Sequence, residues 1–164
     1  MILSFFFNYF YIITISKEHA FHVKKYKPQI TLFFGILGII ALFGNTATID
    51  TGRMNEKWHV TCAGTFFVLT ILACLYNTIL FWIIYFHIKT VKLSSLVVKT
   101  ILSLALIIQA YLDVNSGSLD SYENWKSSDL AHYLEFTLAF TLLAYFAIMG
   151  LDLKGFKMVY RKVN

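Results

Sequence analysis

Four long apolar segments, separated by charged or turn-prone stretches, constrain this 164-residue chain more than any other feature. A helix needs about 20 mostly apolar residues to cross a hydrocarbon core about 30 Å thick. Four segments meet that requirement and predict membrane-spanning helices over residues 30–49, 58–87, 93–114 and 130–151. We therefore predict an all-α membrane protein, a four-helix transmembrane bundle with a short apolar N-terminal segment.

The composition supports the same class, because only 14% of the residues are charged and 58% are hydrophobic. A soluble domain carries about 25% charged residues, so this chain lacks the polar side chains to coat a globule in water. The predicted organisation is a short membrane or interfacial helix over 1–16, a basic connection over 17–29, the four-span bundle over 30–152 and a basic tail over 153–164. The N-terminal segment lacks the basic region and cleavage site of a secretory signal. We favour a short or half-buried membrane helix there.

The basic residues predict how the bundle is oriented. Only Arg53, Lys57 and Lys126 fall on one side of the predicted membrane, which we call the acidic side because it also holds Asp50, Glu56, Asp113, Asp120, Glu123 and Asp129. The other eleven of the 14 lysines and arginines fall on the opposite side: Lys17, Lys24, Lys25, Lys27, Lys89, Lys92, Lys99, Lys154, Lys157, Arg161 and Lys162. By the positive-inside rule this basic end faces the cytoplasm, or the matrix of a mitochondrion. These residues flank apolar segments, a pattern that argues against nucleic acid as a partner.

Small residues predict where the helices pack closely, because they let helix backbones approach one another in a membrane. Gly35, Gly38, Ala41 and Gly44 recur every three residues along the first predicted span. Two further sets predict close contacts of the fourth and second spans: Ala144, Ala147 and Gly150, and Ala63 with Gly64.

Neutral polar residues inside the spans predict hydrogen bonds between helices. Asn45, Asn77 and Gln109 are such residues, and each bond of this kind contributes about 1 kcal/mol. Cys62 and Cys74 are twelve residues apart in one predicted helix, which separates them by about 18 Å. That distance is too long for a disulfide.

Four ionisable residues in or beside the spans are candidate site residues. His59 and Glu135 lie at similar depth near the acidic side, and we expect them to pair, either as a functional site or as a structural pair that fixes helix register. We favour the structural role. Asp152 closes the fourth span and is expected to complement the basic tail. Lys99 is expected to reach back to the basic interface as a snorkelling side chain.

Two stretches resemble the Frag/DRAM/Sfk family of six-span membrane proteins, which includes autophagy modulators and proteins of GPI-anchor lipid remodelling. One is HVTCAGTFF from His59, and the other is LEFTLAFTLLAYFAIMGLDL from Leu134. In the second, Glu135, Phe136 and Asp152 match the family pattern. The resemblance covers residues 28–158 and implies the last four of the family's spans. The first span and most of the second then appear missing, together with the luminal loop between them.

The sequence holds no hydrolase, kinase or phosphate-loop pattern, so we predict no enzyme and no catalytic residue. His132 lies three residues before Glu135 and can share its helix face. No metal-ligand spacing of the HExxH kind accompanies it. We expect no metal and no cofactor, and bound phospholipids as the associated small molecules.

Three functions remain open. The first is a non-catalytic accessory subunit of a larger membrane complex, in contact with other membrane-protein subunits and lipids, with a respiratory or ATP-synthase assembly of the mitochondrial inner membrane as the suggested location. The second, implied by the resemblance, is a lysosomal or Golgi endomembrane protein in lipid organisation, GPI-lipid remodelling or autophagy. A transporter or channel is the least favoured, because residues 93–114 offer little polar lining beyond Ser103 and Gln109.

Overall fold

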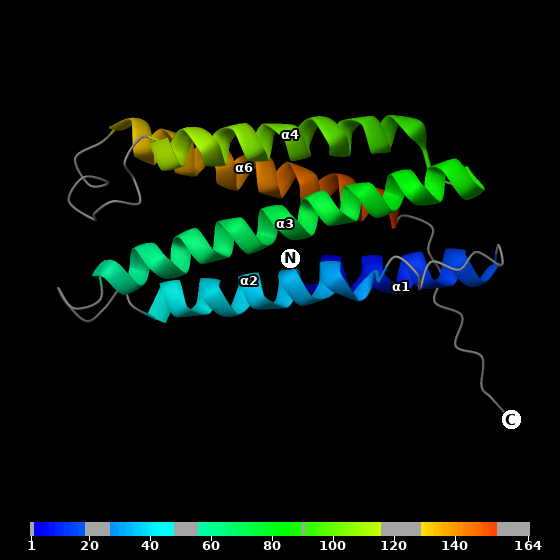
Figure 1. Ribbon diagram of the computed structural model, residues 1–164, viewed down its shortest axis with the longest axis horizontal. Coiled ribbons are helices and arrows are strands. Elements are labelled where there is room, and N and C mark those ends of the chain that lie inside the picture. The colour runs from blue at the N-terminus through cyan, green and yellow to red at the C-terminus, as the bar shows by residue number, and fades with distance from the viewer. Residues whose placement is uncertain (1, 19–26, 48–55, 90, 116–128, 154–164) are drawn as a thin grey trace, which may run out of the picture.

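The computed structural model describes residues 2–18, 27–47, 56–89, 91–115 and 129–153, which form five helices (Figure 1). The helices are α1 (Ile2–Glu18), α2 (Gln29–Ala47), α3 (Glu56–Ile88), α4 (Leu93–Asn115) and α6 (Asp129–Asp152). The last four begin and end within two residues of the predicted spans. The described ranges contain no strand, so the prediction of an all-α helical bundle is confirmed.

Helix length and composition mark this chain as an integral membrane protein. Among the described residues, α3, α4 and α6 are each long and apolar enough to cross a bilayer. Helix α2 has 19 residues and is about 28 Å long, close to the thickness of the hydrocarbon core, although its apolar stretch Gln29–Asn45 is shorter. Helix α3 has 33 residues and is about 50 Å long, so it must tilt or project beyond the bilayer.

Local chemistry sets several of the helix ends. Pro28 stands directly before α2, where its missing N–H costs nothing because the first helical turn leaves that donor without a helical acceptor. Lys89 follows α3 with a φ of 55° and donates its backbone N–H to the Tyr85 carbonyl at 3.0 Å. A left-handed residue in this position is a common helix terminator. At the start of α4, the backbone N–H of Leu96 donates a hydrogen bond to the Lys92 carbonyl oxygen.

The helices alternate in direction, so their ends gather at two faces. The end of α3, the start of α4 and the end of α1 lie at the right of Figure 1, and α2 begins in the right half of the view and runs to the left. Lys17, Lys89 and Lys92 therefore share this basic end, and Lys27 lies before α2 on the same side of the bundle, as the predicted orientation requires. Arg53, Lys126 and the tail from residue 154 lie outside the described residues.

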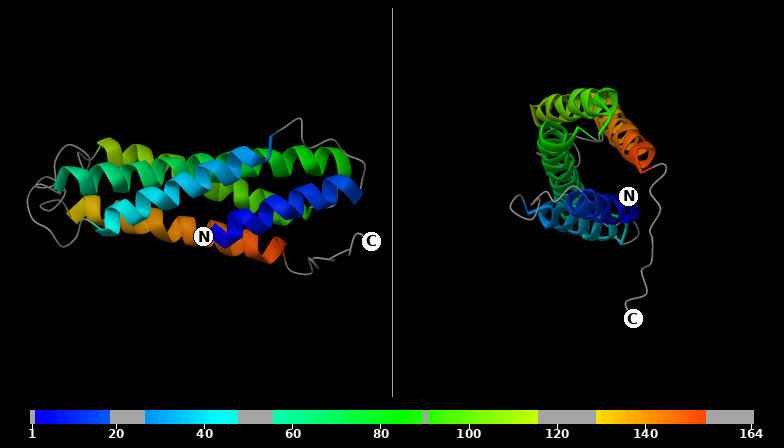
Figure 2. Two further views of the ribbon diagram at one scale, coloured as in Figure 1. Left: turned by 90° about the horizontal axis from the view of Figure 1, so that it is seen from below. Right: turned by 90° about the vertical axis from the view of Figure 1, so that its right-hand side faces the viewer.

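The bundle is held by pairs of neighbouring helices. Helix α2 packs mainly along α3, α4 packs against α6, and α3 joins the two pairs through its contact with α4. Helix α1 lies against α2 and reaches α6, at the opposite edge of the bundle from α4 (Figure 2). Two apolar clusters fill the interior. The first includes Phe5, Ile71, Cys74, Leu138 and Tyr145, and the second includes Ile12, Leu80, Phe81, Ile84 and Leu96.

The glycines of α2 lie where other helices come closest. A Cβ added at Gly35 would stand 2.5 Å from the Phe5 ring of α1. A Cβ at Gly38 or at Gly44 would meet side chains of α3, namely Thr70 Oγ1 at 2.9 Å and Cys62 Sγ at 3.0 Å. The third small residue of the stripe, Ala41, is half-buried. The absence of side chains at the three glycines therefore lets α1 and α3 approach α2 closely.

The prediction for the small residues of α6 is wrong. Ala144, Ala147 and Gly150 are exposed on the outer face of the helix, and a Cβ at Gly150 would have no neighbour within 4 Å among the described residues. The inward face of α6 is occupied instead by large side chains at helical spacing, Leu138, Leu142, Tyr145 and Met149, all buried. Burial of those four rotates the small residues outward.

Candidate functional site

A cleft opens between α3, α4 and α6 toward the acidic end of the bundle. Its empty volume is about 600 Å³, including the space at its open mouth. Helix α3 contributes the longest wall, and α4 and α6 close the other sides. The lining residues are His59, Val60, Ala63, Gly64, Phe67, Val68 and Ile71 of α3, Ala110, Asp113 and Val114 of α4, and Glu135 and Leu138 of α6.

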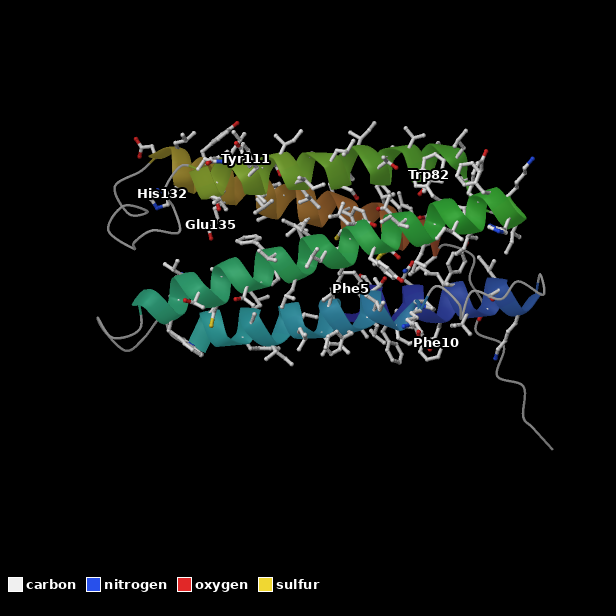
Figure 3. All side chains as sticks on the ribbon, in the orientation of Figure 1. Phe5, Phe10, Trp82, Tyr111, His132 and Glu135 are labelled. Carbon is white, nitrogen blue, oxygen red and sulfur yellow. The ribbon has the colours of Figure 1, made fainter. Side chains whose placement is uncertain are left out.

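One end of this cleft is polar. His59 lies in the first turn of α3, Asp113 in the last turn of α4, and Glu135 in the second turn of α6. All three residues are half-buried. The Glu135 side chain points from α6 toward α3 (Figure 3). Antiparallel packing brings these helix ends to one level, and three ionisable groups from three helices thus share one opening.

The rest of the cleft is apolar. Ile71 lies twelve residues beyond His59 on α3, which carries the wall about 18 Å toward the middle of the bundle. Val68, Ile71 and Leu138 line that deeper part and offer no hydrogen-bonding side chain. A cleft with ionisable groups at the interface and hydrocarbon walls along the membrane depth has the polarity profile of a membrane lipid.

The structure brings the predicted pair His59 and Glu135 to the same cleft and adds a third residue. Asp113 was read from the sequence only as one of several acidic residues on its side of the membrane. Its position in the last turn of an apolar helix, at the depth of His59, was the available signal. Ala63 and Gly64, expected to draw another helix close, line the cleft instead, so their small size leaves space open.

His132 does not line this cleft, although it precedes Glu135 by one helical turn. Its side chain is exposed and lies near the outer end of α6 (Figure 3). Within the described ranges, no three His, Cys, Asp or Glu side chains lie together in a way that could hold a metal ion.

Lys99 is not a snorkelling lysine, contrary to the sequence expectation. Its side chain is fully buried by protein, and its Nζ atom lies 2.5 Å from Asp152 Oδ2. The same Nζ stands 3.4 Å from the centre of the Phe81 ring. The physical reason is the packing of α4 against α6, which supplies a carboxylate inside the bundle. The ammonium group is therefore neutralised where it lies, and Asp152 pairs with α4, whereas the tail expected as its partner lies outside the described residues.

A buried hydrogen-bond network crosses the middle of the bundle. Asn77 of α3 accepts a hydrogen bond from Asn8 of α1 and donates one to the Tyr145 hydroxyl of α6 at 3.0 Å. Thr78 contacts that hydroxyl and Ser103 of α4, each at 2.9 Å. The prediction of an interhelical bond is thus confirmed for Asn77. Sequence reasoning missed Asn8 and Tyr145, because both stand in aromatic-rich apolar runs.

Two further sequence expectations concern the cysteines of α3 and a glutamine of α4. Cys62 and Cys74 are both free and buried, so the prediction that they form no disulfide is confirmed. Gln109 Oε1 is buried without a hydrogen-bond partner in the part of the chain that the structure describes, so the predicted interhelical bond is not seen there.

The comparisons with known proteins identify the family of this bundle. No curated protein and no solved structure matches the chain. The model of the Frag1/DRAM/Sfk1/Cwh43P N-terminal domain matches residues 1–156. The match agrees with the resemblance seen in the sequence but begins earlier than residue 28, so α1 belongs to the matched domain. It supports the DRAM-like alternative, and nothing in it supports a respiratory-complex subunit. The chain belongs to the Frag1/DRAM/Sfk1/Cwh43P N-terminal domain family.

Proposed function

We propose that this protein is a lipid-organising membrane protein of the endomembrane system, and that it holds a membrane lipid in the cleft between α3, α4 and α6. The observation that carries the proposal is the change of polarity along the cleft, from His59, Asp113 and Glu135 at its mouth to Val68, Ile71 and Leu138 in its depth. A lipid headgroup matches the first set and an acyl chain matches the second. Membership of the DRAM-like family supports the same class of function.

Binding without chemical conversion is the action that the lining residues favour. None of the described residues that line the cleft is a serine, threonine, cysteine or lysine, and these are the commonest nucleophiles of acyl transfer. The role of Glu135 and its neighbours is then to position a headgroup. Release of a hydrolysed or transacylated lipid by the purified protein would contradict this part of the proposal.

A cleft-filling substitution tests whether a lipid occupies this place. Ala63→Trp puts a large ring into the lining of the cleft, whereas Ala147→Trp puts the same ring on the exposed outer face of α6. The measurement is crosslinking of a photoactivatable diacyl phospholipid to the full chain in proteoliposomes, with the modified peptides identified by mass spectrometry. We expect crosslinks on the lining segments of α3 and α6 that Ala63→Trp removes and Ala147→Trp retains. Equal crosslinking in both variants would refute lipid occupancy of the cleft.

The proposed location is tested separately in cells. A fluorescent fusion of the full chain is expected to coincide with Golgi or lysosomal markers, in line with the DRAM-like family. Coincidence with an inner-membrane mitochondrial marker, together with migration in a respiratory complex on a native gel, would overturn the endomembrane assignment and restore the accessory-subunit alternative.

A further inference from the structure

We propose that the cleft limits the length of the acyl chain that it accepts, and that Ile71, Ala110 and Leu138 form the floor that sets this limit. The ligand is a lipid of the leaflet on the acidic side, with a chain of about 15 carbons or fewer. This inference rests on the proposed function, that the cleft holds a lipid, and adds the class of its acyl chain.

The floor is the buried part of the lining. Ile71 is 6% exposed and Leu138 is 1% exposed, whereas every other lining residue is half-buried or exposed. Both side chains belong to the apolar cluster that also contains Cys74 and Leu142, one turn further along each helix. A chain that enters from the polar end therefore meets closely packed core at this depth, and it cannot pass without displacing core side chains.

Ile71 and Leu138 lie at one level, which a contact between their helices fixes. The Thr78 hydroxyl oxygen of α3 lies 2.9 Å from the Tyr145 hydroxyl oxygen of α6. Ile71 precedes Thr78 by seven residues, and Leu138 precedes Tyr145 by seven. Because α3 and α6 run in the same direction, both floor residues lie about 10 Å from that contact, on its acidic side.

Ala110 completes the floor from α4. The Ser103 hydroxyl oxygen of α4 lies 2.9 Å from the same Thr78 oxygen. Helix α4 runs opposite to α3 (Figure 1), and Ala110 follows Ser103 by seven residues. Ala110 therefore lies at the level of Ile71, where it packs against the same apolar cluster. Three helices thus close the cleft at one depth.

One side of the cleft opens toward the bilayer. Val68 lines the cleft and is 56% exposed, although it lies nine residues further into α3 than His59. In Figure 1, α3 runs obliquely away from α4 and α6 toward the acidic end, and the small Ala63 and Gly64 leave that space open. An exposed residue at this depth of a membrane-spanning helix faces hydrocarbon, so an acyl chain reaches the cleft laterally from the leaflet on the acidic side.

The distance from the polar end to the floor gives the length limit. His59 and Ile71 are twelve residues apart on α3, about 18 Å along the helix. An extended backbone advances about 3.3–3.6 Å over three bonds, so a saturated chain that spans about 18 Å has about 15 carbons. Shorter chains leave the deep part of the cleft unfilled, and longer chains meet the floor and must fold back.

A chain-length series on the unmodified protein tests this limit. The delipidated full chain in detergent receives an equimolar mixture of didecanoyl, dilauroyl, dimyristoyl, dipalmitoyl, distearoyl and diarachidoyl phosphatidylcholine, and native mass spectrometry distinguishes the bound lipids by mass. Enrichment over the mixture is expected to be greatest for the dimyristoyl lipid. It should be lower by about fivefold or more for the diarachidoyl lipid, because an overlong chain forces the side chains of the floor apart. Equal enrichment across the series, or enrichment that still rises at the longest chain, would overturn the proposal.

Substitutions in the floor locate the limit. Ile71→Ala shortens a floor side chain and is expected to move the maximum to the dipalmitoyl lipid or a longer one. Ala110→Leu enlarges the floor without removing a core side chain, and it is expected to move the maximum to the dilauroyl lipid or a shorter one. Leu72→Ala, at an exposed position of α3 outside the lining, is the control that keeps the maximum. A maximum that stays at the dimyristoyl lipid in either folded floor variant would refute the assignment.

Ala63→Trp separates this inference from the proposed function. If Ala63→Trp lowers total bound lipid but the unmodified protein shows no preference for chain length, the cleft remains a lipid site and only the length limit is rejected. If Ala63→Trp leaves total bound lipid unchanged, the lipid role itself is rejected, and the length limit fails with it.

Discussion

The ion pair between Lys99 and Asp152 gives the sharpest prediction for stability. Lys99 is fully buried and the Asp152 side chain is 9% exposed. Asp152→Asn removes the negative charge that compensates the buried Lys99 ammonium, and removal of one partner from a buried pair costs about 3–5 kcal/mol. Lys99→Met leaves the Asp152 carboxylate, whose side chain keeps some exposure, so its expected cost is smaller, about 1–3 kcal/mol.

The two buried cysteines supply the assay. Cys62 and Cys74 are free but shielded in the folded protein, so a thiol-reactive fluorogenic maleimide reports unfolding as the detergent-solubilised chain is heated. For a chain of this size about 1 kcal/mol corresponds to about 2–4 °C in Tm. Asp152→Asn is therefore expected to lower the Tm by at least about 6 °C. Lys92→Met, which removes an exposed lysine before α4, should leave the Tm unchanged.

The double variant decides whether the pair itself is responsible. Lys99→Met with Asp152→Asn removes both charges together and leaves no uncompensated charge in the bundle, which is the main cost of breaking a buried pair. We expect the double variant to be less destabilised than Asp152→Asn alone, with a coupling of about 0.5–3 kcal/mol. A double variant whose loss equals the sum of the single losses would refute the interpretation that these groups interact.

Two further predictions use the same thermal assay. Asn77→Ala is expected to cost about 1–2 kcal/mol of stability, more than Tyr145→Phe, because Asn77 bonds to two other helices and such bonds average about 0.6 kcal/mol each. If Asn77→Ala were as stable as the unmodified chain, the hydrogen-bond network would have no role in stability. Gly35→Ala should lower the Tm, because the added methyl overlaps the Phe5 ring at a cost of about 1–3 kcal/mol. Gly150→Ala should leave the Tm unchanged or raise it, because no described side chain lies within 4 Å of the added methyl. The reverse order would show that α1 does not pack as described.

The helices themselves were predictable because membrane helices are defined by local sequence. A run of about 20 apolar residues between charged flanks has few alternatives in a bilayer, where every backbone polar group must be bonded within its own segment. The limits of α3 and α4 follow from that rule to within two residues. The close packing at the glycines of α2 was also predictable, since with Ala41 they recur every three residues along the helix. The inward face of α6 could not be predicted from the sequence, because large and small residues alternate around that helix and only the neighbouring helices decide which set is buried.

The candidate site was predictable only in part. His59 and Glu135 are conspicuous as ionisable residues at span ends, and a carboxylate near a membrane interface needs a favourable neighbour wherever the helix lies. The inclusion of Asp113, and the cleft that Ala63 and Gly64 leave open, depend on how α3, α4 and α6 face one another. No feature of the sequence fixes those rotations.

The sequence by itself determined that this chain is a bundle of membrane helices with one basic end, because hydrophobic length and flanking charge act segment by segment. Only the tertiary structure decided the fate of its polar groups. Lys99 lies inside the bundle because α6 brings Asp152 to it, and Asn77 joins α1 to α6 because Asn8 and Tyr145 of those helices reach its side chain. The energy of a polar group in a membrane depends on the partner it meets, and that partner is supplied by another helix.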